Sequence, residues 1–402
     1  MTELSSGPKS FVDFLHELNT LSWEERTIFV DRYLNSLPTV PYIEKESLVH
    51  FIFHGDAENI TIPSDANDWS LSEFSMKRIE GTNFWYFSHR FESDARLDYK
   101  FVINGVHWIL DPLNPRRIEG GYGENSELRM PKYVSPPEIE FHPEIPHGSI
   151  TEMSFNSEIL GNSRMIAVYT PHQYNRANES YPVALFHDGL EFLSLGRANN
   201  ILDYLIARKR ITPLIAVFVP PVDRNAEYAG AQMNSFYSFI VDELLPYIDR
   251  IYRTKKQPPD RASIGASSGG NASLWLGLHY PETFGNIAAL SSNIVSGVTS
   301  GYENSPRLNI KFYLNIGTYD MEQLIPLVHN FVTLICTKGY PYVYRKYNEG
   351  HSWGNWRAHV GRALEYYFPG KINIDRSWRR FCRKVKTEES QLKLLSSHNN
   401  GR

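Results

Sequence analysis

A short run rich in glycine and serine is the part of this chain best suited to chemistry. Residues 265–270 read Gly-Ala-Ser-Ser-Gly-Gly, which places Ser267 in a Gly-x-Ser-x-Gly pattern with one further glycine behind it. The run 261–264 leads in as a strand, and apolar positions within 274–278 give the following residues a helical period. A serine on a tight turn between a strand and a helix is the arrangement of a nucleophile elbow. We therefore predict that Ser267 is a catalytic nucleophile; a flexible loop is the alternative.

Two polar residues later in the chain supply a candidate acid and a candidate base. Asp320 lies just after a predicted buried strand, and His351 lies just after the next strand-like run. Serine, acid and histidine occur in this order along the chain in α/β hydrolases. We expect His351 to accept the proton of Ser267 and Asp320 to orient the imidazole. Glu322 is the alternative acid.

An oxyanion formed during ester cleavage needs backbone N–H donors. The N–H of Ser268, the residue after the nucleophile, is one expected donor. Residues 182–186 read as another buried strand, and the turn after it offers the N–H of Leu190 or Gly189 as the second donor. His187 in the same turn is a rival base, although its place before the elbow suits turn structure or substrate contact better.

Residues 1–147 have a different pattern from the rest of the chain. Apolar residues at helical spacing predict two helices within 11–34, which we expect to form a helical hairpin. Short runs with turn residues between them, 48–53, 84–91 and 97–103, predict strands of a small β sandwich. We expect an N-terminal helical segment at 1–46, a β sandwich at 47–130 and a linker at 131–147. An α/β-hydrolase domain at 148–370 and a basic, partly disordered tail at 371–402 follow.

The second half of the chain resembles the esterase D and enterochelin esterase branch of the α/β hydrolases. The resemblance is carried by motifs at 164–171, 187–189, 224–228, 243–253, 265–270 and 350–357. It implies a mostly parallel, doubly wound sheet and a serine carboxylic-ester hydrolase that works through an acyl-enzyme without an organic cofactor. The family nucleophile, histidine and acid correspond to Ser267, His351 and Asp320.

The residues around the expected triad favour an anionic aromatic ester. We expect substrate contacts from an arginine and aromatic set on two loops, namely Arg224, Tyr228, Trp353, Trp356 and Arg357. Arginine and aromatic side chains together suit a catecholate through ion pairing and cation–π contact. The alternative for Trp356 and Arg357 is that they begin the last helix and pack there. An enterochelin-type siderophore ester is thus the favoured substrate, and its iron would belong to the substrate.

Residues 48–130 resemble the early-set, immunoglobulin-like modules that precede some esterases. Such a module can bind glycan, and Trp69, Trp85 and Trp108 could stack on a sugar ring, although burial in the sandwich core or a domain interface is the favoured alternative. The module could also shape the substrate cleft. Two other functions stay open: a feruloyl or acetyl esterase with a glycan-binding module, and a non-catalytic binding protein on a hydrolase scaffold.

Composition limits the remaining possibilities. The 402 residues carry a formal net charge of −4, which argues against general nucleic-acid binding. Two cysteines are too few for a disulfide framework. We see neither a secretory signal, nor an apolar run long enough to span a membrane, nor a metal-ligand cluster, so a cytoplasmic enzyme with a small-molecule ester substrate and no metal is expected.

Overall fold

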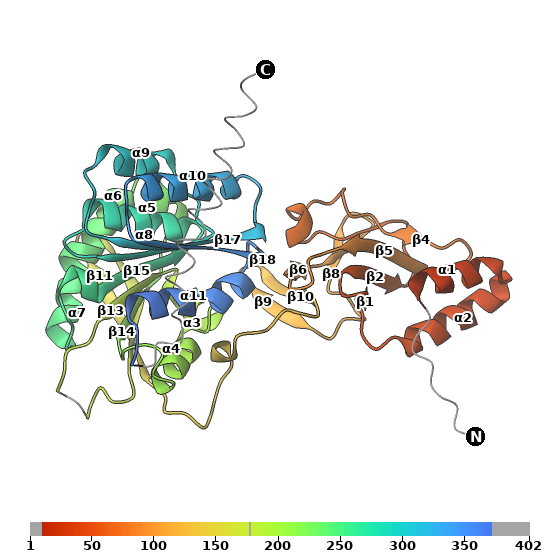
Figure 1. The fold of residues 1–402 in the computed structure, drawn as a ribbon, viewed down its shortest axis with the longest axis horizontal. Helices are drawn as coiled ribbons and strands as arrows, with labels where there is room; N and C mark the ends of the chain where they lie inside the picture. Colours follow the sequence, from red (N-terminus) through yellow and green to blue (C-terminus); the bar gives the residue numbers. More distant parts are fainter. Residues whose placement is uncertain (1–9, 177, 372–402) are drawn as a thin grey trace, which may run out of the picture. The chain divides into compact units, whose positions relative to one another are not determined.

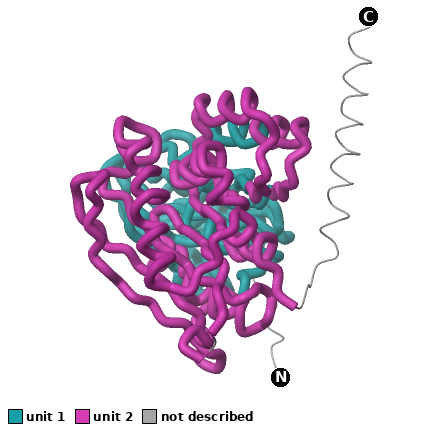
Figure 2. Tube along the Cα trace, turned by 90° about the vertical axis from the view of Figure 1, so that its left-hand side faces the viewer, with its two compact units in different colours: residues 1–137, 315–330, 346–358 teal, residues 138–314, 331–345, 359–402 magenta. Residues whose placement is uncertain are grey.

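The computed structural model describes residues 10–176 and 178–371, which form two compact units (Figures 1 and 2). Of the described residues, those in 1–137, 315–330 and 346–358 form unit 1, and those in 138–314, 331–345 and 359–402 form unit 2. Two segments of the predicted hydrolase domain therefore belong to unit 1. The predicted domain limits stay predictions. The expected basic tail from 372 onward and residues 1–9 lie outside the described residues.

Unit 1 begins with the predicted pair of helices, α1 (Phe11–Thr20) and α2 (Trp23–Ser36). The hydroxyl of Ser10 accepts a hydrogen bond from the Asp13 N–H at 3.1 Å, and the Ser22 N–H donates to the Glu25 carboxylate at 3.1 Å. Each helix therefore begins where a side chain satisfies a backbone group at its first turn. The strands of unit 1 that follow are β1 (Tyr42–Glu44), β2 (Leu48–His54), β3 (Ile60–Thr61), β4 (Lys77–Arg78), β5 (Phe84–Arg90), β6 (Arg96–Tyr99), β7 (Phe101–Ile103), β8 (His107–Ile109), β9 (Arg117–Gly120) and β10 (Gly123–Arg129).

Strand β2 is largely buried because both of its faces are covered. Phe51 packs in the core of the β sandwich, whereas the next residue, Ile52, packs against α1 and α2. The antiparallel partner β5 repeats this division, since Phe87 pairs with Phe51 and Tyr86 pairs with Ile52. Successive side chains of a strand point to opposite faces, so one sheet serves two cores.

The strand predicted at 97–103 is two strands. Strand β6 pairs with β10, and β7 pairs with β3 and β8 in a separate three-stranded sheet. Lys100 lies between them, and its N–H donates to the Pro63 carbonyl at 3.0 Å. The chain thus changes sheets at one residue, which an apolar pattern alone does not reveal.

Unit 2 contains six strands of the larger sheet, in the order β11-β12-β14-β13-β15-β16, and the amino-terminal parts of β17 and β18, which follow in that order. The four strands from β14 to β16 pair in parallel, and β11 and β12 are antiparallel. The bounds are β11 (Ser149–Ser157), β12 (Asn162–Thr170), β13 (Val183–His187), β14 (Ile215–Val219), β15 (Arg261–Ala266), β16 (Asn286–Leu290), β17 (Lys311–Tyr319) and β18 (Tyr342–Gly350).

Helices cover both faces of this sheet, which explains why its central strands are buried throughout. Helices α5, α6, α8 and α9 lie along one face, and α3 and α4 lie along the other (Figure 1). The α-helices are α3 (Gly189–Ser194), α4 (Ala198–Ala207), α5 (Arg224–Ala229), α6 (Met233–Ser238), α7 (Leu245–Ile251), α8 (Ser268–His279), α9 (Ser296–Asn304), α10 (Leu324–Thr337) and α11 (Trp353–Tyr367). The 3₁₀ helices are η1 (Asp65–Asn67), η2 (Pro137–Ile139) and η4 (Pro258–Asp260), and η3 (Phe239–Leu244) is a π-helix between α6 and α7.

The topology brings two loops of unit 2 to one edge of the sheet. Strand β13 lies between β14 and β15, so the chain reverses its direction of travel across the sheet there. The carboxyl ends of β13 and β15 are neighbours, with Phe186 paired to Ile264. Ligands bind at such a switch point in open α/β sheets.

Candidate active site

Ser267 occupies the turn between β15 and α8 with an unusual backbone conformation. Its φ and ψ are 54° and −124°, and its N–H donates to the Leu290 carbonyl at 2.8 Å. Such dihedrals are costly for a residue with a side chain and occur where the fold imposes them. A Cβ added at Gly265 would collide with the backbone of Gly269, so the turn requires glycine at that position. The predicted strand, tight turn and helix are confirmed.

The expected oxyanion donors lie at the first turns of two helices. Ser268 is the first residue of α8, and Gly189 and Leu190 are the first residues of α3. Asp188 precedes α3 with a φ of 50°, which turns the chain sharply after β13. N–H groups in the first turn of a helix have no acceptor within the helix. Both turns therefore present backbone donors at the carboxyl edge of the sheet.

Arg224 and Tyr228 hold the turn that begins α3. Arg224 binds both carboxylate oxygens of Asp188 at 2.8 Å each, and the Asp188 N–H donates to the Tyr228 hydroxyl at 2.7 Å. The Arg224 side chain is 39% exposed, whereas Tyr228 is 0% exposed. The burial of Tyr228 favours a role in positioning this turn over the expected contact with substrate. Part of the Arg224 side chain stays accessible to solvent.

His187 lies at the end of β13, where it is fully buried. Its Nε2 is 3.0 Å from the Ser263 hydroxyl. Burial, together with the positive charge of Arg224, lowers the pKa of His187 to about 3. A histidine that stays neutral and enclosed suits the structural reading of this residue, and the rival assignment as a base finds no support in its surroundings.

The buried His187 gives the fold a defined dependence on pH. The folded protein leaves this residue unprotonated down to a pH of about 3, whereas an unfolded histidine binds a proton near about 6.5. The unfolded state therefore binds more protons between these values, so stability is complete above about pH 6.5 and is lost as the pH falls. We expect a loss of up to about 1.4 kcal/mol per pH unit from this group.

Urea unfolding from pH 4 to pH 8 measures this slope. His187→Gln should flatten it, and His172→Gln, which changes an exposed histidine of the same unit, should leave it unchanged. Equal slopes in all three proteins would contradict the assignment.

Asp320 and His351 lie together in unit 1. Asp320 follows the last residue of β17, and His351 follows the last residue of β18. The His351 Nδ1 is 2.7 Å from Asp320 Oδ1, and the Asp320 carboxylate also accepts from the N–H of Met321 at 3.0 Å and of Gly317 at 3.3 Å. The carboxylate is fully buried and the imidazole is 19% exposed. A buried carboxylate on Nδ1 fixes the orientation and the tautomer of the imidazole, as the predicted role of Asp320 requires.

Glu322, the alternative acid, is exposed to solvent. The hydrogen bond to His351 is formed by Asp320, which lies two residues before Glu322. The local geometry therefore favours Asp320 as the partner of the histidine.

The first turn of α11 places two tryptophans beside His351. The Trp356 ring meets the His351 ring edge to face, with centroids 5.0 Å apart, and Trp353 packs against Trp356 in the same way at 5.0 Å. Trp353, Trp356 and Arg357 are all buried. Their burial favours packing around the histidine, the alternative raised for Trp356 and Arg357. Substrate contact by these residues stays a prediction.

Residues 92–98 contribute contacts that the sequence analysis did not expect. The Tyr319 hydroxyl donates to Glu92, and the Asn348 amide donates to Asp94 at 2.8 Å. Arg96 in β6 donates to the hydroxyl of Ser352 at 3.2 Å. A signal was present, because Arg96 and Asp98 are opposite charges inside a run otherwise suited to a buried strand.

Two general features of the described residues bear on function. No group of three or more histidine, cysteine, aspartate or glutamate side chains suited to a metal ion occurs in residues 10–176 and 178–371. Within the same ranges, every helix is too short or too polar to cross a membrane.

The sequence of this chain is similar to those of known esterases. The family model described as "Putative esterase" matches residues 157–367. An iron(III) enterobactin esterase of Escherichia coli O6:H1 is 26% identical over 275 residues, which are 62% of this chain and 67% of that protein. An endo-1,4-beta-xylanase/feruloyl esterase of Xylanibacter ruminicola is 31% identical over 163 residues, which are 38% of this chain and 22% of that protein.

Among solved structures, enterobactin esterase from Shigella flexneri in the presence of enterobactin has a similar fold. The TM-score is 0.70 at 22% sequence identity, and the match covers 84% of this chain and 97% of that chain. The predicted α/β-hydrolase fold is confirmed by this likeness. The match also extends well beyond residues 157–367, so it includes part of the chain outside the esterase family model.

Proposed function

We propose that this chain, which belongs to the putative esterase family, is a serine esterase for catecholate siderophore esters of the enterobactin type. The family membership makes it a carboxylic-ester hydrolase. Ser267 is the nucleophile, His351 the general base and acid, and Asp320 the residue that orients His351. The observation that carries the assignment is the 2.7 Å hydrogen bond between His351 and a buried Asp320, together with the strained turn at Ser267.

The reaction proceeds in two stages. The Ser267 hydroxyl oxygen attacks the ester carbonyl carbon while His351 Nε2 takes its proton. The N–H groups of Ser268 and of Leu190 or Gly189 hold the negative oxygen of the tetrahedral intermediate. His351 then gives the proton to the departing alcohol, which leaves an acyl-enzyme. A water deprotonated by His351 attacks that acyl group, and collapse of the second intermediate releases the acid and restores Ser267.

The extent of the similarities supports the siderophore substrate over a plant-polysaccharide ester. The match to the iron(III) enterobactin esterase covers 62% of the chain, and the fold likeness to another enterobactin esterase covers 84%. The match to the xylanase/feruloyl esterase covers 38%. The fold that this chain shares with an enterobactin esterase over 84% of its length is consistent with a substrate of this class. The partly exposed Arg224 supplies a cation for the catecholate charge.

A feruloyl or acetyl sugar esterase is the second candidate, because the xylanase/feruloyl esterase is 31% identical over its matched residues. The tryptophans proposed for glycan contact differ in exposure. Trp85 is buried and Trp69 is half-buried with its Nε1 bonded to Asp65, whereas Trp108 is 48% exposed. Trp108 is therefore the residue whose replacement by alanine tests glycan binding in the full chain.

A substrate panel with product masses tests the proposal. Ferric and iron-free enterobactin, methyl ferulate, acetylated xylo-oligosaccharides and nitrophenyl acetate are compared by kcat/KM. We expect enterobactin to exceed the feruloyl and acetyl sugar esters by at least about 10-fold, because a site built for charged catechols leaves its polar groups unpaired with other esters. Preference for the sugar esters would favour the second candidate, and no hydrolysis of any ester would favour a non-catalytic binding protein.

A further inference from the structure

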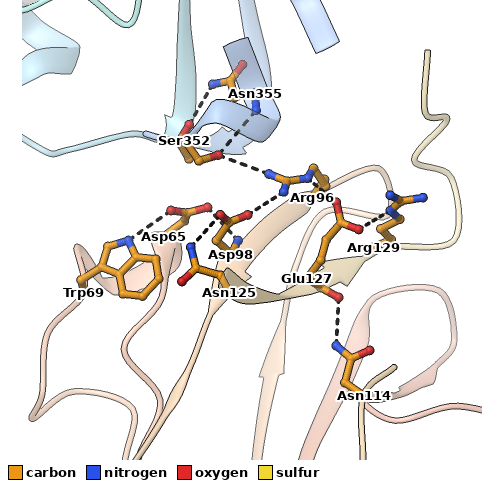
Figure 3. Close-up of polar contacts among 11 residues, drawn as sticks. Asp65, Trp69, Arg96, Asp98, Asn114, Asn125, Glu127, Arg129, Ser352 and Asn355 are labelled. Carbon is orange, nitrogen blue, oxygen red and sulfur yellow. Dashed lines mark hydrogen bonds and ion pairs between the residues drawn. The ribbon is translucent and has the colours of Figure 1, made fainter. Parts of the chain in front are cut away.

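The guanidinium of Arg96 is buried in unit 1 among polar groups, with 1% of the residue exposed (Figure 3). Its Nε donates to Glu127 at 2.7 Å, and its Nη2 donates to Asp98 at 2.6 Å. Two carboxylates therefore pair with its charge, as a buried cation requires. The third group, Nη1, donates to the hydroxyl of Ser352 at 3.2 Å. Arg96 thus connects the β sandwich to the residue that follows His351.

Arg96 contacts the chain on both sides of His351. Before the histidine, Glu349 at the end of β18 pairs with Arg96 in parallel. After it, a Cβ added at Gly354 would collide with the guanidinium, so the guanidinium lies directly against the first turn of α11. Arg96 therefore meets β18 through its backbone and α11 through its side chain, on the two sides of His351.

Asp65 fixes the residue just before His351. A Cβ added at Gly350 would collide with the Asp65 carboxylate, so that carboxylate lies against the Gly350 backbone. Asp65 is held in turn by the Asp98 N–H at 2.8 Å and the Trp69 Nε1 at 3.2 Å. From the other side, the Asn355 amide donates to the Gly350 carbonyl at 2.8 Å. Little freedom is left to the backbone that carries the imidazole.

We propose that Arg96 is a positioning residue for the esterase reaction, acting through Ser352 and the backbone of 349–354 to keep His351 aligned with Asp320. Arg96 of the β sandwich then contributes to the position of the catalytic histidine, whatever the module contributes to substrate binding. The inference rests on the proposed function of His351 as general base. Misplacement of a catalytic group by about 1 Å can lower a rate by about 100-fold. Because Arg96 and Ser352 are buried, their effect falls on kcat and leaves KM for a small ester nearly unchanged.

Two variants and a matched control test this role. Ser352→Ala removes the hydroxyl that accepts from Arg96 Nη1 and leaves no charge unpaired. Arg96→Lys keeps a cation near Asp98 and Glu127 but removes the guanidinium nitrogen that donates to Ser352. Arg129→Met is the control, since Arg129 donates to the other oxygen of Glu127 at 2.6 Å and lies on the side of Glu127 away from Ser352 (Figure 3). Hydrolysis of nitrophenyl acetate is measured well below each melting temperature. The kcat is expressed per site titrated with a fluorophosphonate, which removes any unfolded fraction from the comparison.

We expect kcat per titrated site to fall about 10-fold in Ser352→Ala and about 10- to 100-fold in Arg96→Lys, with KM within about twofold of wild type. Arg129→Met should stay within about twofold in both constants. Wild-type kcat per titrated site in Ser352→Ala and Arg96→Lys, with an inactive Ser267→Ala enzyme, would overturn the inference alone. A wild-type protein that hydrolyses no ester would overturn the proposed function and this inference with it.

Discussion

Replacing Ser267 by alanine is expected to lower kcat for ester hydrolysis by at least about 10⁴-fold, because the acyl-enzyme route loses its nucleophile. The fold should persist, since the turn is imposed by the close approach of Gly265 to the Gly269 backbone and does not depend on the serine hydroxyl. The measurement is the steady-state rate with the best ester of the panel, combined with the melting temperature.

Covalent labelling gives a second reading of the same prediction. A fluorophosphonate should add one label per molecule to the wild-type protein, at Ser267, and no label to Ser267→Ala. Ser296→Ala, which changes an exposed serine at the start of α9, should retain both activity and labelling. Full activity in Ser267→Ala, or labelling at another serine, would contradict the assignment of the nucleophile.

Asp320→Asn is expected to have the second largest effect, a decrease in kcat of about 10³- to 10⁴-fold. The buried carboxylate accepts the Nδ1–H of His351 at 2.7 Å, which holds the proton on Nδ1 and stabilises the imidazolium formed during the reaction. An asparagine in its place can donate its amide N–H to Nδ1, which favours the tautomer with the proton on Nε2, so Nε2 loses its role as proton acceptor. Rates across pH with a nitrophenyl ester measure the loss.

Glu322→Gln is the matched control for this variant. Glu322 is an acid two residues away, it is exposed, and its replacement changes the net charge by the same amount. We expect its kcat to stay within about twofold of wild type. A large loss in Glu322→Gln with a small loss in Asp320→Asn would reverse the assignment of the acid.

The elements that could be read from the sequence are those whose cause is local. Helical periodicity and polar residues in the first turns predicted the helix pair α1 and α2. The spacing of the glycines predicted the turn at Ser267. The run 97–103 was read as one strand, because an apolar pattern reports burial but not which sheet covers the residue. The change of sheet at Lys100 depends on partners far away along the chain.

The substrate set shows the same limit. Tyr228 and Arg357 were expected at the substrate because aromatic and cationic residues suit a catecholate. Both are buried, and the Tyr228 hydroxyl accepts the Asp188 N–H. Residue type indicates what a side chain can bind, whereas packing sets its accessibility, so substrate contact by these two residues stays a prediction.

The class of reaction could be predicted from the sequence, since a glycine-flanked serine, a later acid and a later histidine indicate ester hydrolysis through their types, order and strand-end positions. The preference for Asp320 over Glu322 needed the fold, in which Asp320 forms the hydrogen bond to His351, and the contacts of Arg96 are visible in the fold alone. Arg96 and Ser352 are 256 residues apart along the chain, yet they form a hydrogen bond in a buried cluster. A local pattern sets the conformation of a few neighbouring residues, but the partner of a buried charge is chosen by how distant segments pack, because that charge must find its counterions wherever the fold places them.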